Sequence, residues 1–98
     1  MLKTARYAAT PHTKARNHRI PIEVIEYLAG VRSDGALDGS LCLFEVIVIS
    51  HGANPEPLAP IMARPASSGE VFFGKKIAPD YPESFAAGEY LLVQITKL

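Results

Sequence analysis

The sequence has one cysteine and no long apolar segment, and each shortage excludes a class of protein. Cys42 cannot form a disulfide within its own chain, which favours a reducing, cytoplasmic environment. The longest apolar run, Leu41–Ile49 (LCLFEVIVI), is interrupted by Glu45 and is too short to cross a bilayer. No apolar segment follows the basic residues Lys3 and Arg6, so we expect no signal peptide. These shortages predict a cytoplasmic protein.

The sequence also lacks the motifs of catalysis and of cofactor or metal binding. Ser50 directly precedes His51, and neighbouring strand residues point to opposite faces, so without a turn between them the two cannot act together as nucleophile and base. The histidines His12, His18 and His51 are too widely spaced to predict a metal site. Cys42 lies among apolar residues, where we expect a buried, unreactive thiol. The sequence therefore predicts no cofactor and no metal, and it favours a protein that is not an enzyme.

No acidic residue occurs in the first 19 positions. Residues 1–19 hold five basic residues and carry a charge of +5, whereas residues 20–98 hold five basic and ten acidic residues and carry −5. The segment 10–19 (TPHTKARNHR) has neither a helical nor a strand period, so we predict a basic loop or arm there. Such a separation of charge is typical of an interaction arm, and it equally suits an arm that folds back onto an acidic body.

The 98 residues are enough for one small domain. Apolar residues recur at helical spacing over 21–29, between Pro21, which suits a first helical turn, and Gly30, which suits a helix end. Alternating apolar residues predict strands at 3–9, 41–50, 70–77 and 89–98. The expected fold is α+β, with a small, mainly antiparallel sheet of three to five strands, one short helix near 21–29 and long proline-containing loops. A small, partly open β-barrel is the alternative.

The strand predicted at 41–50 is apolar on both faces, apart from Glu45. Such a strand is normally central in its sheet and covered on both sides. One short helix covers only one side, so the other side needs either the proline-containing segment 52–69 or another subunit. We expect 52–69 to be an ordered, partly extended cover, because loops of this length are uncommon in compact domains unless they have a function or are disordered.

The favoured hypothesis is a self-associating or partner-binding domain, which forms a homo-oligomer or binds another protein. It follows from the strand that needs a second cover, from the separated basic arm and from the lack of a catalytic group. The residues expected to contact the partner or an anion are Lys14, Arg16, His18 and Arg19.

Two alternatives stay open. The same arm could bind nucleic acid or another anionic ligand through phosphate contacts, although Tyr7 is the only aromatic residue near it that could stack on a base. Small-molecule binding or catalysis would instead use His51 beside the loop 52–69, because functional residues are often placed where a strand ends. Neither alternative predicts a membrane partner.

Overall fold

The computed structural model describes residues 2–11, 16–30, 37 and 39–98, and these residues form an α+β fold. The one helix in these ranges is α1 (Ile22–Ala29). The strands are β1 (Lys3–Ala9), β2 (Asn17–Arg19), β3 (Cys42–Ile49), β4 (Glu56–Pro57), β5 (Ile61–Ala63), β6 (Glu70–Phe72) and β7 (Tyr90–Lys97). The predicted fold class is confirmed, and the described strands do not close into the alternative barrel.

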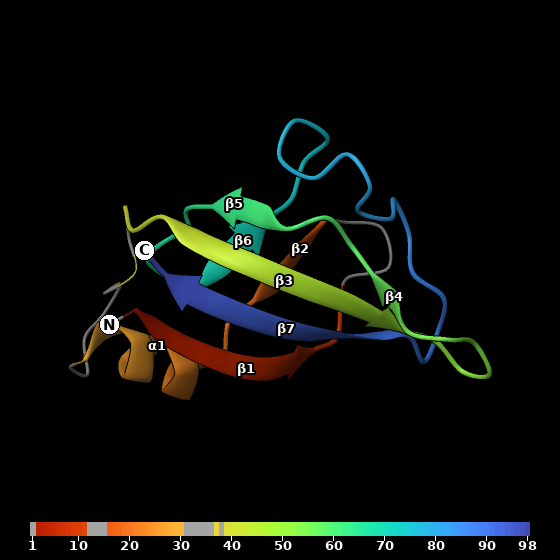
Figure 1. The fold of residues 1–98 in the computed structure, drawn as a ribbon, viewed down its shortest axis with the longest axis horizontal. Coiled ribbons are helices and arrows are strands. Elements are labelled where there is room, and N and C mark those ends of the chain that lie inside the picture. The colour runs from red at the N-terminus through yellow and green to blue at the C-terminus, as the bar shows by residue number, and fades with distance from the viewer. Residues whose placement is uncertain (1, 12–15, 31–36, 38) are drawn as a thin grey trace.

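The main sheet has five antiparallel strands in the order β1-β7-β3-β4, with β5 also paired to β3. The long strands β7 and β3 are central, and β4 and β5 share the outer edge of β3. In Figure 1 the main sheet passes in front of a second sheet, the antiparallel pair of β2 and β6. The helix α1 lies beside β1.

The core lies behind the main sheet, between it and the β2–β6 pair. The inward-facing side chains of β3 are at most 3% exposed, namely Cys42, Phe44, Val46 and Val48. The ring of Phe44 meets that of Phe73, just after β6, with 5.2 Å between their centroids. This contact joins the main sheet to the second sheet by an edge-on aromatic pair.

The helix begins after Pro21 and ends at Gly30, as the sequence predicts. Gly30 has φ 79°, a left-handed conformation that glycine adopts without strain, and its N–H donates to the carbonyls of Glu26 and Tyr27 at 3.1 and 3.2 Å. The buried side chains of the helix are Val24, Ile25 and Leu28. The local sequence is therefore sufficient to explain where this element starts and stops.

Part of the basic segment 10–19 is a strand, which corrects the prediction of a loop. The residues Asn17–Arg19 form β2 and pair with Glu70–Phe72 of β6. The N–H of Phe73 also donates to the carbonyl of Arg16 at 2.6 Å. Residues 12–15, which include Lys14, lie outside the described residues. A strand of three residues is too short to show an alternating pattern in the sequence. Its order comes from pairing with the distant strand β6.

The proline-containing segment 52–69 is ordered, but it does not cover the outer face of β3. It supplies β4 and β5, which pair along the edge of β3 instead of crossing its outer face. The strand predicted at 70–77 is also shorter than expected and ends at Phe72. Within the described part of the chain, the outer face of the two central strands is left without a cover, which corrects the expected role of 52–69.

Candidate functional site

The outward-facing side chains of β1, β7 and β3 form a surface that we call the open face. The strand register arranges them in three rows across the sheet: Thr4–Thr96–Leu43, Arg6–Gln94–Glu45 and Ala8–Leu92–Ile47. Pro57 of β4 continues the row of Ile47, and Met62 of β5 continues the row of Leu43. Figure 1 looks onto this face, and no described helix or strand lies in front of it.

The middle row is a polar chain that crosses three strands. Arg6 Nε donates to Gln94 Oε1 at 2.8 Å, and Gln94 Nε2 donates to Glu45 Oε1 at 2.9 Å. The amide of Gln94 therefore separates the cation on β1 from the carboxylate on β3. Among the described residues neither Arg6 nor Glu45 forms an ion pair. The row has a positive end and a negative end, and each end retains hydrogen-bonding capacity toward the outside.

The row Ala8–Leu92–Ile47, on one side of this polar chain, exposes apolar side chains. Leu92 is 42% exposed and Ile47 is 36% exposed, and both lie on the two central strands. Tyr90 of β7, opposite Ile49 in the next row, extends this apolar surface and is 41% exposed. Met62 of β5, 44% exposed, lies on the other side of the polar chain. Scattered apolar side chains are normal on a protein surface, whereas neighbouring ones on one face mark an interaction site.

A groove of about 640 Å³ runs over the open face. Its floor includes Ile47 and Leu92 and the polar chain of Arg6, Gln94 and Glu45. One wall comes from the segment 52–69, through Pro57, Leu58 and Pro60. Among the described residues, no histidine, cysteine, serine or threonine lines the groove. The groove can therefore bind an apolar surface with charged groups beside it.

The described members of the predicted contact set, Arg16, His18 and Arg19, do not form one surface. The guanidinium of Arg16 donates to the carbonyl of Ala78 at 3.1 Å and lies 3.7 Å from Glu83, with 12% of its side chain exposed. Lys75 also pairs with Glu83 at 2.8 Å, and its hydrogen bond and charge, with the charge of Arg16, lower the pKa of that carboxyl. Arg19 is exposed on β2. Arg16 is thus already engaged within the fold.

His18 is buried in the core, so it lies away from the surface where a partner would bind. Its Nε2 shares a 2.9 Å hydrogen bond with the hydroxyl of Tyr7, and its ring also packs against Phe73. Burial lowers the pKa of the His18 imidazole to about 4, because a charged ring loses its hydration there. Among the described atoms, neither His18 Nδ1 nor the hydroxyl of Tyr81 has a hydrogen-bond partner. His18 is therefore neutral at physiological pH and belongs to the core.

His51 is exposed and does not line the groove, although the segment that follows it does. It lies near Gly88, where an added Cβ would come within 3.3 Å of His51 Cδ2. The neighbouring hydroxyl of Ser50 donates to Glu89 Oε2 at 2.5 Å, and this bond, together with one from the backbone of Ala86, lowers the pKa of the Glu89 carboxyl. Ser50 and His51 follow the end of β3 and both contact the segment Gly88–Glu89.

Cys42 is fully buried, and burial raises the pKa of its thiol. In the described ranges no three His, Cys, Asp or Glu side chains are grouped so that they could hold a metal ion. No helix in the described part of the chain has the length and apolar character needed to span a membrane.

One solved structure with a similar fold is the solution structure of PHS018 from Pyrococcus horikoshii. The two structures align with a TM-score of 0.56 over 96% of this chain and 88% of that one, at 15% sequence identity. This chain shares its fold with that protein. The likeness reaches no further than the fold at this level of identity. No family model and no curated protein matches the sequence.

The polar chain of Arg6, Gln94 and Glu45 is the part of the site that sequence reasoning missed. The sequence contains an indication of this chain, since Glu45 and Gln94 each interrupt a strand that is otherwise rich in apolar residues. The signal becomes a site only through the register, which sets Arg6 opposite Gln94 and Gln94 opposite Glu45.

Proposed function

We propose that this protein is a non-enzymatic binding domain whose open face docks onto the surface of another protein molecule. The observation that carries the proposal is the exposure of Leu92 and Ile47 on the two central strands. A solvated face of an antiparallel sheet normally carries polar residues, alternating with the apolar residues of the core face. The open face departs from that pattern at the centre of the sheet, where a partner gains most from burial.

The shape and chemistry of the groove support a protein partner. Its apolar floor lies beside a row with charged ends, which resembles the apolar centre and polar surroundings of protein interfaces. The apolar side chains supply the free energy of binding, and the charges select the orientation of the partner. The buried single cysteine agrees with a place in the reducing cytoplasm, which is part of the proposal.

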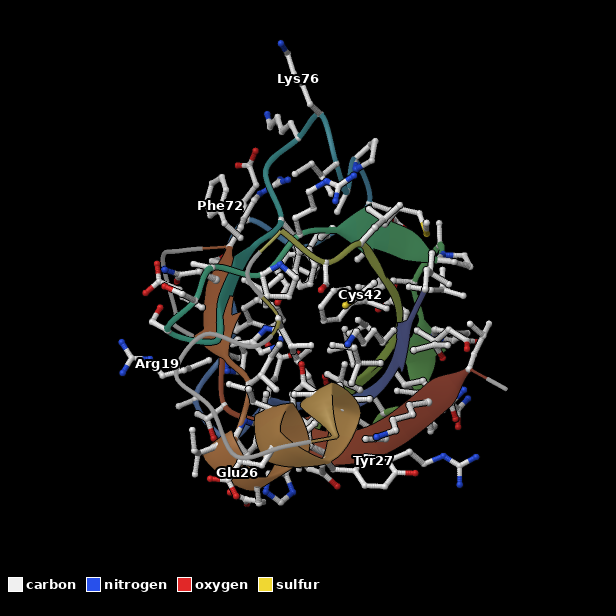
Figure 2. All side chains as sticks on the ribbon, turned by 90° about the vertical axis from the view of Figure 1, so that its left-hand side faces the viewer. Arg19, Glu26, Tyr27, Cys42, Phe72 and Lys76 are labelled. Atoms are coloured by element: carbon white, nitrogen blue, oxygen red, sulfur yellow. The ribbon has the colours of Figure 1, made fainter. Side chains whose placement is uncertain are left out.

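Site-specific photo-crosslinking in cells tests the proposal. Leu92 and, as a control, Phe72 are each replaced by p-benzoylphenylalanine, and crosslinked proteins are identified by mass spectrometry. Phe72 is a sound control because it is 58% exposed and lies on the opposite side of the molecule from β3 and β7 (Figure 2). We expect one identified protein, which is either a second copy or a different chain, to crosslink at position 92 and not at position 72. Equal yields at the two positions, or none at position 92, would overturn the proposal.

A further inference from the structure

The order of charges across the open face points to one particular partner. The middle row runs from positive to neutral to negative, and Gln94 of β7 is at its centre. Resting on the proposed function, we infer that the open face binds a second copy of this chain, related by a two-fold axis that runs parallel to β7 between the two sheets. The inference names the partner and its orientation, which the proposed function leaves open.

Rotation by 180° about this axis turns one open face onto the other and exchanges the two sides of β7. The strand β1 of each copy then lies over β3 of the other. Arg6 faces Glu45 of the partner subunit, Glu45 faces Arg6 of the partner subunit, and Gln94 faces Gln94 of the partner subunit. Two ion pairs form at once, because an interface with two-fold symmetry contains every contact twice.

A different two-fold axis fits the charges badly. An axis that runs along the middle row, across the strands, would place Arg6 opposite Arg6 of the partner subunit and Glu45 opposite Glu45 of the partner subunit. Like charges opposed in an interface cost binding free energy and exclude that arrangement. The charge pattern therefore selects the axis parallel to β7.

The side-chain sizes in the apolar row also agree with a two-fold axis parallel to β7. The row Ala8–Leu92–Ile47 becomes Ile47–Leu92–Ala8 after rotation, so the small side chain of Ala8 opposes the large side chain of Ile47. Leu92 meets Leu92 of the partner subunit at the centre. The wall of Pro57, Leu58 and Pro60 stands beyond β3, where it flanks the partner's β1. Alternation of large and small side chains lets two facing sheets pack about 10 Å apart.

The size of the face sets the expected strength of the dimer. Four strands about 4.8 Å apart and eight residues at about 3.3 Å each give a face of roughly 19 by 26 Å, or about 500 Å² per subunit. A standard stable interface buries about 800 Å² per partner. The dimer should therefore be weak and should dissociate on dilution, so the two ion pairs are a measurable share of its stability.

Charge exchange in the purified protein tests the inference. Sedimentation equilibrium over a wide range of concentration measures dimer formation by the wild type, by Arg6→Glu, by Glu45→Arg and by the double variant. Each single variant opposes like charges twice, and we expect its dissociation constant to rise about tenfold or more. The double variant restores both opposite-charge pairs, and its dissociation constant should return close to that of the wild type. Thermal unfolding followed by circular dichroism confirms that each variant is folded.

An equal mixture of the two single variants provides a further test. Alone, each variant opposes Glu with Glu or Arg with Arg, whereas a mixed dimer opposes Glu with Arg at both places. We expect the mixture to form mixed dimers with about the affinity of the wild type. A loss of association caused by local misfolding would not be repaired by mixing.

The outcomes separate the inference from the proposed function. A wild-type dimer that is indifferent to the charge variants would overturn the axis and leave the proposed function standing. A wild type that is monomeric at every concentration, together with a crosslink from position 92 to a different protein, would also overturn the inference and support the proposed function. A monomer without any crosslink at position 92 would overturn both.

Discussion

Polar side chains have opposite surroundings on the two faces of the main sheet. On the inner face, Tyr7 is buried and hydrogen-bonded to the buried His18 of β2, and burial keeps the imidazole neutral at physiological pH. On the open face, Arg6 and Glu45 are charged and joined only through the amide of Gln94. Inner polar groups thus serve the fold of this chain, whereas the outer charges retain bonding capacity for a second molecule.

The largest expected effect comes from truncating one large side chain on each face of β3. Phe44→Ala removes a fully buried ring that packs against Phe73, and we expect a loss of about 3–5 kcal/mol in the free energy of unfolding. Ile47→Ala, on the open face of the same strand, should cost about 1 kcal/mol or less. Denaturant unfolding at low protein concentration measures both. Similar losses for the two variants would contradict the distinction between the faces.

The second prediction concerns the pH dependence that His18 gives to the fold. The folded-state pKa of about 4 lies below the ordinary value of 6.5, so the unfolded chain takes up the proton first as pH falls. The stability that the neutral His18 contributes is fully present above pH 6.5 and decreases as the pH falls from about 6.5 to 4. The loss should approach roughly 3 kcal/mol at the acid end of this range.

The matched control for His18 replaces both partners of its hydrogen bond with apolar side chains. A double variant, Tyr7→Phe with His18→Leu, leaves no half of the pair unsatisfied and should fold at pH 7. Its stability should change much less than that of the wild type between pH 7 and pH 5, a range that lies above the ordinary pKa values of Asp and Glu side chains. Parallel curves for the two proteins would show that His18 is not the group responsible.

Arg16, directly before the short strand β2, and Arg19, within it, give a similar contrast on a smaller scale. Arg16→Glu removes the hydrogen bond to the carbonyl of Ala78 and places a second negative charge near Glu83, so we expect a loss of about 2 kcal/mol. Arg19→Glu alters an exposed side chain and should change stability by about 0.5 kcal/mol or less. Thermal unfolding of the two variants provides the measurement. An Arg16 variant as stable as the Arg19 variant would mean that Arg16 is free for a partner, as the sequence alone predicts.

The elements that the sequence predicts are those whose causes are local. The helix α1 follows from Pro21, Gly30 and the apolar spacing between them, and β3 and β7 follow from alternation over eight residues each. The strand β2 has no such local cause, because its order comes from pairing with β6 and from the packing of His18 against Tyr7 and Phe73.

The candidate site depends even more than β2 on contacts between residues far apart in the sequence. Glu45 and Gln94 are visible as polar interruptions in apolar strands, but their hydrogen bond joins residues 49 positions apart. The bond from Arg6 to Gln94 joins residues 88 positions apart. Only the register of three strands brings these side chains into one row, and the alternation within each strand does not show which residues of the other strands lie opposite. The sequence also does not predict that the outer face is uncovered, because the length of the segment 52–69 does not show whether it crosses the face or follows its edge.

The smallest expected effect belongs to the polar chain itself. If Arg6 and Gln94 serve a partner and not the fold, their coupling within the monomer is weak. A double-mutant cycle of Arg6→Ala and Gln94→Ala, measured by denaturant unfolding at low protein concentration, should give a coupling of about 0.2–1 kcal/mol, as is usual for exposed cross-strand pairs. A coupling above about 2 kcal/mol would make the row a structural network like that of the inner face. In that case the difference between the two faces would lie in exposure alone, and the charge variants would have to be interpreted through the stability of the monomer.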